Sequence, residues 1–260
     1  MYSIINGELF TAEDAKISIT DLALQRGYGA FDFFKVVNYQ PRFLQFHLQR
    51  FYQSAAELRL PVGMDETELE KLIFQLIEKN NVANAGIKIT ITGGYSGDGY
   101  TLSTPNLILS QSLLSTNTQT GINLVTYNYQ RQLPHIKTID YLHAIYLQPF
   151  IKENNAQDVL YHHNGEITEC PRANFFIVTE NDKVVTPAKN ILAGITRKRI
   201  LALKDIEVKE GIITLADLKN AKEAFITSTT KDVLPVLKID GNVVGNGEPG
   251  KISKKIAAVI

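Results

Sequence analysis

This sequence is poor in cysteine and has no excess of charge of either sign. Its one cysteine, Cys170, cannot form a disulfide within the chain, which fits a reducing compartment. Lys plus Arg and Asp plus Glu each number 27, so the formal net charge is zero. Without a basic excess or a visible Lys/Arg cluster, the chain has no electrostatic footprint for nucleic acid or an anionic membrane.

Long apolar runs and targeting signals are also missing. No apolar run approaches the ~20 residues of a membrane-spanning helix, and the initial MYSIINGELF lacks the basic and apolar regions of a secretory signal. His162 and His163 point to opposite faces of a predicted strand, and no Cys/His/Asp spacing completes a metal site. No serine lies in a nucleophile elbow. These absences predict a soluble, cytoplasmic globular protein with no metal, membrane or nucleic-acid partner.

Residues 1–112 alternate strand and helix patterns, which predicts a small N-terminal α/β domain. One helix is expected from about His47, with apolar residues three and four apart. A second begins at Asp65, which forms a capping box with Glu68. The predicted strands are FFKVVN (33–38), GIKITIT (86–92) and NLILSQ (106–111). The last two are expected to pair across a Gly-rich loop.

Strand patterns dominate the rest of the chain. Residues 113–121 are polar and turn-rich, which predicts an interdomain linker, and 122–260 form a larger C-terminal domain. Its predicted strands are INLVTY, DVLYHH, NFFIVT, KVVTP, EAFITS, PVLKID and NVVG, and its predicted helices lie near 140–153, 197–204, 215–222 and 251–260. The fold class is therefore mixed, α+β or α/β, with two domains.

Two residues have surroundings that suggest chemistry. Lys137 lies between a turn-like Leu-Pro and apolar helix residues, and desolvation by apolar neighbours lowers a lysine pKa and makes it a Schiff-base amine. An ordinary helix-end lysine is the alternative. Glu169 lies between two predicted core strands, where an unpaired carboxylate is costly. A protonated pyridine nitrogen would be a suitable partner, and an ion pair with Arg172 is the alternative.

Three segments offer groups that bind anions. LAGITRKRIL (192–201) places Gly194 just before a predicted helix, whose first N–H groups and positive end attract anions, and Thr196 adds a hydroxyl. TSTTK (227–231) offers further hydroxyl and N–H groups after a predicted strand, and Arg50 in HLQRF would supply a cation. Each has an ordinary alternative, because many helices start this way without a ligand and many arginines lie on exposed helix faces.

In order along the chain, six segments resemble the fold-type IV enzymes that depend on pyridoxal 5′-phosphate (PLP): ISITDLALQRGYGAFD, HLQRF, IKTIDYL, GEITECPRANFF, TPAKNILAGITR and STTKDVLPV. This class IV aminotransferase family includes D-amino-acid and branched-chain aminotransferases and aminodeoxychorismate lyases. The resemblance covers most of the chain. It implies a small α/β N-terminal domain, a larger strand-rich pseudo-barrel that binds PLP, amino-acid and 2-oxo-acid substrates, and a homodimer whose sites are completed across the interface.

The resemblance also implies roles for single residues. Lys137 would form the Schiff base and then act as general base and acid, and Tyr141 would hydrogen-bond the cofactor's phenolic oxygen. Glu169 would hold the pyridine nitrogen protonated. The phosphate would be held by Arg50, Ile195, Thr196 and Thr229, the ring would be covered by Leu192, and the further cofactor-binding residues would be Arg172, Asn174, Gly194 and Ser228.

The substrate side departs from the family's patterns. D-amino-acid aminotransferases resemble this chain around Phe31 to Asn38, but usually bind the substrate carboxylate with an arginine and a histidine in the loop after the strand that corresponds to GIKITIT. Here that loop carries Asp98, which cannot bind a carboxylate favourably. We expect Arg172 and Arg26, from one or two subunits, to replace that pair, with a structural role as the alternative for each. The predicted substrate-binding residues are Arg26, Phe31, Phe33, Lys35, Tyr95, Asp98, Tyr100, Arg172 and Thr230.

Three functions are compatible with these residues. The first is a ping-pong transaminase, with the D-amino-acid type slightly favoured over the branched-chain L type by the short chain and the context of Lys35. The second is an aminodeoxychorismate lyase, which releases pyruvate without an amino acceptor. Its loop resembles SGDGY but often has an arginine in place of Asp98. The third is a catalytically idle PLP-binding protein, against which the presence of both Lys137 and Glu169 argues.

Overall fold

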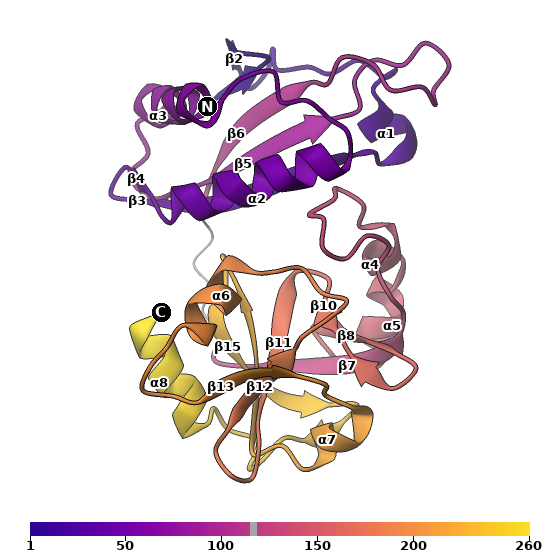
Figure 1. The fold of residues 1–260 in the computed structure, drawn as a ribbon, viewed down its shortest axis with the longest axis vertical. Coiled ribbons are helices and arrows are strands. Elements are labelled where there is room, and N and C mark those ends of the chain that lie inside the picture. The colour runs from indigo at the N-terminus through magenta and orange to yellow at the C-terminus, as the bar shows by residue number, and fades with distance from the viewer. Residues whose placement is uncertain (115–118) are drawn as a thin grey trace. The chain divides into compact units, whose positions relative to one another are not determined.

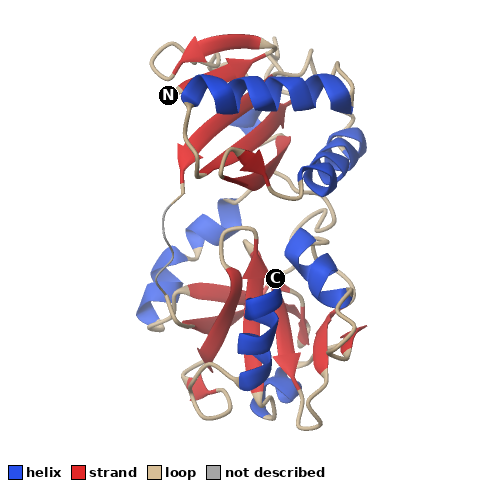
Figure 2. Cartoon of the chain, turned by 90° about the vertical axis from the view of Figure 1, so that its left-hand side faces the viewer, coloured by secondary structure: helices blue, strands red, loops and turns tan. Residues whose placement is uncertain are grey.

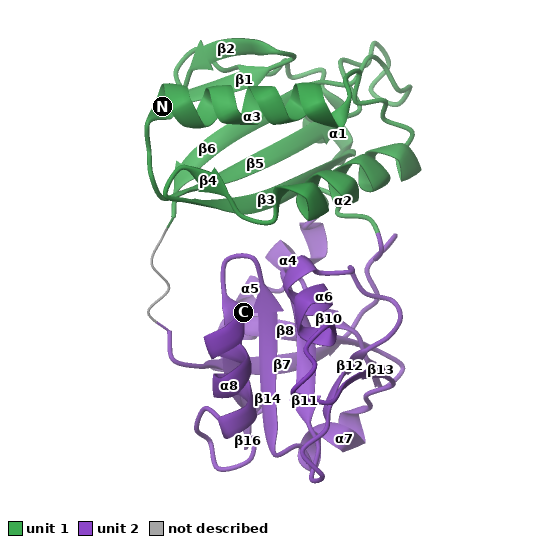
Figure 3. Ribbon diagram, turned by 60° about the vertical axis from the view of Figure 1, so that its left-hand side comes forward, with its two compact units in different colours: residues 1–116, 136–140 green, residues 117–135, 141–260 purple. Residues whose placement is uncertain are grey.

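The computed structural model describes residues 1–114 and 119–260, which form two compact units (Figure 3). The units are Met1–Thr116 with Ile136–Asp140 (unit 1), and Asn117–His135 with Tyr141–Ile260 (unit 2). The predicted linker, 113–121, includes residues 115–118, which lie outside the described residues. Ile136–Asp140 belongs to unit 1, whereas the sequence alone assigns these residues to the C-terminal domain.

Within the described residues, unit 1 contains a six-stranded antiparallel sheet with the order β2-β1-β6-β5-β3-β4. Its strands are β1 (Tyr2–Ile5), β2 (Glu8–Thr11), β3 (Gly29–Val37), β4 (Gln40–Pro41), β5 (Ala85–Thr92) and β6 (Leu107–Leu113), and its helices are α1 (Leu22–Arg26), α2 (Leu44–Glu57) and α3 (Glu66–Asn80). Helices α2 and α3 lie across the sheet (Figures 1 and 3). The predicted strands, both predicted helices and the pairing of β5 with β6 are confirmed.

The two long helices of unit 1 bury one face each. At the start of α3 the Asp65 side chain accepts a hydrogen bond from the Glu68 N–H at 2.8 Å, and Glu68 accepts one from the Asp65 N–H at 3.0 Å, as the capping box predicts. The buried residues of α3 are Leu69, Ile73, Leu76 and Ile77, which pack into the core of unit 1. Helix α2 also buries two polar side chains, His47 and Ser54. The inner face of α2 therefore carries polar groups as well as the apolar side chains of the core.

Strand β3 sends alternate side chains to two environments. Ala30, Asp32, Phe34 and Val36 are buried, and Phe31, Phe33 and Lys35 are partly exposed. The alternation is regular except that one of the buried residues carries a charge. Three of the predicted substrate-binding residues therefore share the partly exposed face, and Asp32 lies on the other.

The edge of β3 is extended by residues from much later in the chain. The Phe31 N–H donates to the Lys137 carbonyl at 2.9 Å, and the Ile139 N–H donates to the Gly29 carbonyl at 3.0 Å. Thr138 lies opposite Ala30 in an antiparallel bridge between them. Gly29 permits this approach, because a Cβ there would lie 2.5 Å from the Ile91 carbonyl oxygen and 3.0 Å from the Ile139 side chain. This pairing places Ile136–Asp140 in unit 1.

Unit 2 contains a ten-stranded sheet within the described residues, with the order β13-β12-β11-β14-β15-β7-β8-β9, while β10 pairs with β11 and β16 with β15. Its strands are β7 (Ile122–Asn128), β8 (Asp158–His163), β9 (Glu166–Ile167), β10 (Glu169–Cys170), β11 (Ala173–Val178), β12 (Val184–Pro187), β13 (Val208–Gly211), β14 (Glu223–Ser228), β15 (Asp232–Ile239) and β16 (Asn242–Val243). All the strands predicted after residue 121 are present.

The two ends of this sheet meet. Just after β13, the Ile213 carbonyl accepts the Ile167 N–H of β9 at 2.7 Å, and Thr214 forms a bridge with Glu166. The sheet therefore curls, and a buried apolar cluster that includes Phe175, Ile226 and Leu234 fills its inside. This arrangement confirms the predicted strand-rich pseudo-barrel.

Short helices surround the sheet of unit 2 (Figure 2). They are α4 (Leu142–Tyr146), α5 (Gln148–Glu153), α6 (Ile195–Leu201), α7 (Leu215–Lys219) and α8 (Lys251–Val259). The helix predicted near 140–153 is two helices, because the chain bends at Leu147 and restarts with Pro149 in the first turn of α5. In the part of the chain that the structure describes, no helix is long and apolar enough to cross a membrane.

Candidate active site

Lys137 is held tightly in unit 1, although it belongs to no helix or strand. Its carbonyl accepts a hydrogen bond from β3, and its N–H donates to the Ser54 hydroxyl of α2 at 3.3 Å. The side-chain Nζ lies 4.4 Å from the centroid of the Phe31 ring, and the preceding residue, Ile136, is buried. The amine therefore faces an aromatic ring of β3, and its backbone is fixed on both sides.

Arg50, on α2, is bound to a carboxylate that the sequence patterns did not reveal. Its Nε and Nη2 donate to the two oxygens of Asp32 at 2.8 and 2.9 Å. His47, one turn earlier on α2, makes a third contact with Asp32 through Nδ1 at 2.7 Å. Asp32 is 0% exposed. The only sequence signal for this cluster is an aspartate at a position of β3 where the alternation predicts an apolar residue.

Glu169 lies in unit 2 at the start of β10 and is 4% exposed. Its Oε1 accepts from Arg131 Nε at 2.8 Å, and its Oε2 accepts from the Leu192 N–H at 2.9 Å. The guanidinium partner is thus Arg131, not Arg172, the partner considered from the sequence. Arg131 itself is held by the Pro134 carbonyl at 2.6 Å. No motif marks Arg131, which lies 38 positions before Glu169.

The loop before α6 is packed against Asn174. The Asn174 side chain donates to the Leu192 carbonyl at 2.7 Å, and a Cβ on Gly194 would lie 2.0 Å from its oxygen. Only glycine fits that position, which fixes the turn leading to Ile195 and Thr196, the first residues of α6. Both are buried. The structure therefore brings five predicted cofactor-binding residues together at one turn: Asn174, Leu192, Gly194, Ile195 and Thr196.

The second hydroxyl cluster follows β14. Ser228 and Thr230 lie 3.3 Å apart through their hydroxyl oxygens, and Ser228 accepts the Lys231 N–H at 3.2 Å. Ser228 and Thr229 are partly exposed, and Thr230 is exposed. The turn is thus compact and presents its hydroxyl groups at the end of the strand.

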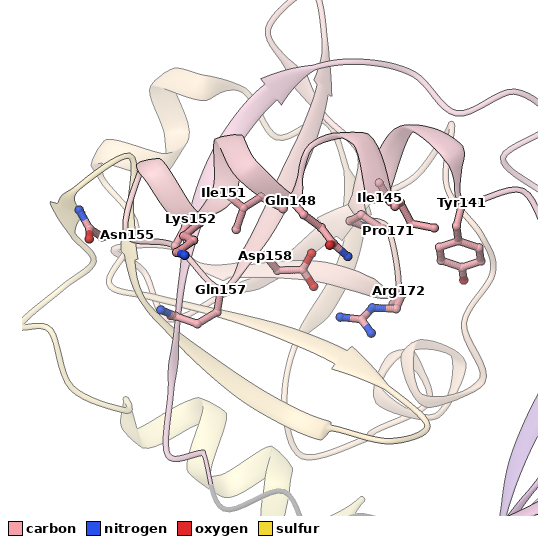
Figure 4. Close-up of a pocket in the computed structure, with 12 residues that line it drawn as sticks. Tyr141, Ile145, Gln148, Ile151, Lys152, Asn155, Gln157, Asp158, Pro171 and Arg172 are labelled. Carbon is pink, nitrogen blue, oxygen red and sulfur yellow. The ribbon is translucent and has the colours of Figure 1, made fainter.

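Arg172 and Tyr141 line one cavity of unit 2. The cavity has a volume of about 730 Å³ and is bounded by α4, α5 and the start of β8. Figure 4 shows the side chains of Arg172 and Asp158 turned towards the same space. Burial raises the pKa of Asp158, and the charges of Lys231 and Arg172 oppose that rise. Arg172 therefore has an acidic neighbour, while its guanidinium stays exposed.

The remaining predicted substrate residues lie in unit 1. Arg26, at the end of α1, is next to the SGDGY loop, because a Cβ on Gly99 would lie 3.5 Å from Arg26 Nη2. Asp98 accepts hydrogen bonds from Ser96, Thr101 and the Tyr100 N–H, and these lower its pKa. The aspartate thus organises its own loop. Tyr95 and Tyr100 are exposed.

Phe33 and Lys35 are placed on the same face of β3 as Phe31. The Phe33 ring covers Gly86 of β5, where a Cβ would lie 2.3 Å from the ring. The Lys35 carbonyl accepts the Arg42 N–H at 2.8 Å, next to the turn into β4. The face that carries the Phe31 ring beside Lys137 therefore continues along the strand through these two side chains.

Comparison with known proteins identifies the family. Residues 29–239 match the model of amino-transferase class IV. The D-alanine aminotransferase of Staphylococcus haemolyticus is 30% identical over 264 residues, which cover 97% of this chain and 94% of that protein. A putative branched-chain-amino-acid aminotransferase of Methanocaldococcus jannaschii is 30% identical over 272 residues, covering 97% and 92%. The chain belongs to the class IV aminotransferase family.

The fold agrees with this membership. The branched-chain amino acid aminotransferase from Escherichia coli superimposes with a TM-score of 0.89 at 28% identity, over 98% of this chain and 91% of that one. The PLP-bound form of a hypothetical aminotransferase from Mycobacterium tuberculosis superimposes with a TM-score of 0.87 at 20% identity, over 100% and 97%. The predicted family, its mixed two-domain fold and its PLP-dependent aminotransferase class are confirmed.

The residues of this class IV aminotransferase fit PLP, whose polar groups are an aldehyde, a phenolic hydroxyl, a ring nitrogen and a phosphate. An aldehyde partner requires a primary amine, which Lys137 supplies beside the Phe31 ring. Glu169 is a buried carboxylate, as a protonated ring nitrogen requires. Arg50 and the hydroxyls of Thr196, Ser228 and Thr229 provide phosphate donors of the ordinary kinds.

Proposed function

We propose that this class IV aminotransferase moves amino groups between small amino acids and 2-oxo acids, and that it favours D-amino acids over branched-chain L-amino acids. The observation that carries the proposal is Lys137, whose backbone is fixed by β3 and α2 while its amine extends over Phe31. The D preference is supported by the likeness to D-alanine aminotransferases along nearly the whole chain.

In this proposal the cofactor supplies an electron sink for the electrons left at the substrate Cα when its proton departs. Lys137 would hold the cofactor through its amine, and once an incoming amine replaced it there, the freed amine of Lys137 would take the proton from the substrate Cα and return it on the cofactor side. Glu169 would keep a proton on the ring nitrogen, and Arg131 orients the Glu169 carboxylate through its Nε hydrogen bond. Release of the first 2-oxo acid before the second binds gives ping-pong kinetics.

The other cofactor contacts complete the proposal. Tyr141 would donate to the phenolic oxygen, Leu192 would cover the ring, and Arg172, Asn174 and Gly194 would shape the site around it. The phosphate would be held by Arg50, Ile195, Thr196, Ser228 and Thr229. The enzyme is a cytoplasmic homodimer in this proposal. An interface between subunits is supported by the exposed apolar side chains of α4, which are Leu142, Ile145 and Tyr146.

A half-reaction assay tests this function. The yellow enzyme is mixed with one amino acid at a time, without an amino acceptor, and loss of the visible cofactor band is followed. We expect conversion by D-alanine and D-glutamate and none by L-leucine. Conversion by L-leucine alone would reverse the preferred branch. A lyase would release pyruvate from a chorismate-derived amine with no acceptor, and no conversion by any amine would leave an idle PLP-binding protein.

Arg172 and Arg26 are proposed to bind the substrate carboxylate, and the other proposed substrate-binding residues are Phe31, Phe33, Lys35, Tyr95, Asp98, Tyr100 and Thr230. Because a guanidinium–carboxylate pair contributes roughly 1.5–3 kcal/mol, Arg172→Ala should raise the amino-acid KM about tenfold or more. The PLP dissociation constant should change less than about threefold. Arg42→Ala removes an exposed arginine stacked on Phe43 and is the control for loss of charge alone. Equal losses of substrate and PLP binding would refute this assignment for Arg172.

A further inference from the structure

The carboxylate of Asp32 is the centre of a buried polar cluster that the proposed chemistry does not itself use. It lies on the face of β3 that packs on α2, and α2 supplies two of its side-chain partners, Arg50 and His47, while the Phe33 N–H of β3 also donates to it at 2.8 Å. Arg50 binds it through two hydrogen bonds, one to each oxygen, and His47 binds one of these oxygens as well. The side chains of Asp32, His47 and Arg50 are 0%, 2% and 12% exposed.

The charges of this cluster make its geometry rigid. Burial by itself would raise the pKa of Asp32, but the Arg50 charge and the hydrogen bonds from His47 and Arg50 outweigh it and lower that pKa. Burial lowers the pKa of His47, and the charges of Arg50 and Lys137 lower it further against the pull of Asp32. At neutral pH, Asp32 is therefore ionised and His47 is neutral. Arg50 is the counter-charge, and separating a buried ion pair is costly.

Two bonds to one carboxylate also fix the plane of the guanidinium. Asp32 accepts from Nε and Nη2, so this edge of Arg50 is turned towards β3. Nη1 and the second hydrogen of Nη2 form the edge that faces away from Asp32. An anion that binds Arg50 therefore contacts an edge of the guanidinium whose orientation is already fixed by Asp32. A lone arginine on an amphipathic helix would have to lose rotamer freedom to offer the same edge.

The same two elements hold Lys137. Phe31, the residue before Asp32, bonds the Lys137 backbone and contacts its amine. Ser54, one turn after Arg50 on α2, accepts the Lys137 N–H. Neighbouring residues of β3 and successive turns of α2 thus set both the Lys137 amine and the Arg50 guanidinium within unit 1. In PLP the aldehyde and the phosphate-bearing arm are attached to adjacent ring carbons, so their binding groups need one fixed separation.

We propose that Asp32 is a positioning residue for the cofactor phosphate: it holds the Arg50 guanidinium at the orientation and the separation from Lys137 that PLP requires. This inference rests on the proposed role of Arg50 as a phosphate ligand. His47 supports Asp32 through a further contact with Oδ1, the oxygen that also accepts from Arg50 Nη2. A carboxylate that merely stabilised the core would affect folding but would not discriminate between cofactors with and without a phosphate.

The test compares PLP with pyridoxal, which has the same ring and aldehyde and no phosphate. The dissociation constants of both are measured on the apo-enzyme by the visible band, and the pyridoxal-to-PLP ratio reports the phosphate contribution. The variants are Asp32→Asn, Arg50→Ala and Arg50→Lys. Asp21→Asn is the matched control, because Asp21 is also a fully buried carboxylate of unit 1, bonded to Thr92 and Asn106.

Asp32→Asn removes the charge and one of the two acceptors, so we expect the ratio to fall about tenfold or more, with pyridoxal binding changed less than about twofold. The phosphorus-31 resonance of bound PLP should move towards that of free PLP. Arg50→Ala should lower the ratio at least as far, and Asp21→Asn should leave it unchanged. If Asp32→Asn does not fold, Arg50→Lys decides, because a lysine keeps the charge but cannot make the two-bond pair, and the ratio should again fall.

Each failure has its own pattern. If the ratio falls for Arg50→Ala but not for Asp32→Asn, the positioning role is overturned and Arg50 remains the phosphate ligand. If Asp32→Asn does not fold, a ratio that falls for Arg50→Ala but not for Arg50→Lys has the same consequence. A ratio unchanged in Arg50→Ala removes Arg50 from the phosphate site, and with it this inference. An equal fall in Asp21→Asn attributes the effect to destabilisation of unit 1 and also overturns the positioning role.

Discussion

Lys137→Ala should abolish multiple-turnover transamination, with kcat lowered by about 10⁴-fold or more, because in the proposed function this one residue provides both the covalent attachment of the cofactor and the proton transfer. The variant should fold, since its backbone bonds to Phe31 and Ser54 do not involve the side chain. It should also lose the visible band of the enzyme-bound cofactor. Stopped assays with D-alanine and a 2-oxo acid measure the first effect, and absorption spectra measure the second.

Lys88 provides a matched control for this experiment. Its Nζ lies 4.9 Å from the centroid of the same Phe31 ring, compared with 4.4 Å for Lys137, and burial lowers the pKa of its amine. Lys88 is therefore the competing amine. Lys88→Ala should keep kcat within about threefold. Borohydride reduction followed by peptide mapping should find the cofactor on Lys137. Label on Lys88, or normal turnover by Lys137→Ala, would rule out the assignment.

The periodic parts of the fold are predictable from local sequence. The capping box of Asp65 and Glu68 sets the start of α3 because both hydrogen bonds lie within four residues. The alternation of β5 sets its burial in the same way. The break between α4 and α5 was not predicted, since the apolar pattern runs on through Leu147 while the backbone does not.

The groups that support the candidate site are harder to predict than the candidate residues themselves. Lys137 and Glu169 stand in motifs, so a resemblance finds them. Arg131 pairs with Glu169 from 38 positions away, and Asp32 pairs with Arg50 from 18 positions away, so neither contact leaves a local pattern. A charge at a buried strand position is the one available signal, and it shows that a partner is needed without showing which.

Replacing Glu169 has the second largest expected effect, because its carboxylate both pairs with Arg131 and, in the proposed function, pairs with the ring nitrogen of the cofactor. Glu169→Gln keeps an oxygen that can accept the Leu192 N–H but removes the charge opposite Arg131, whose side chain is 16% exposed. An uncompensated, mostly buried guanidinium should lower the free energy of unfolding by about 3 kcal/mol. A ring nitrogen without a carboxylate partner loses its proton, and kcat should fall by roughly 10²–10³-fold even at saturating PLP, as for the loss of a group that stabilises charge in the transition state.

The control must separate lost stability from lost chemistry. Glu223 of β14 accepts the N–H groups of Ile252 and Ser253 at 2.9 and 2.8 Å, where α8 begins, so Glu223→Gln should also lower the melting temperature of unit 2. Its kcat should stay within about threefold of the wild type, because Glu223 holds a helix end and no cofactor group. If kcat at saturating PLP fell equally in both variants, the effect of Glu169 would be one of stability, and the ring-nitrogen role would have to be given up.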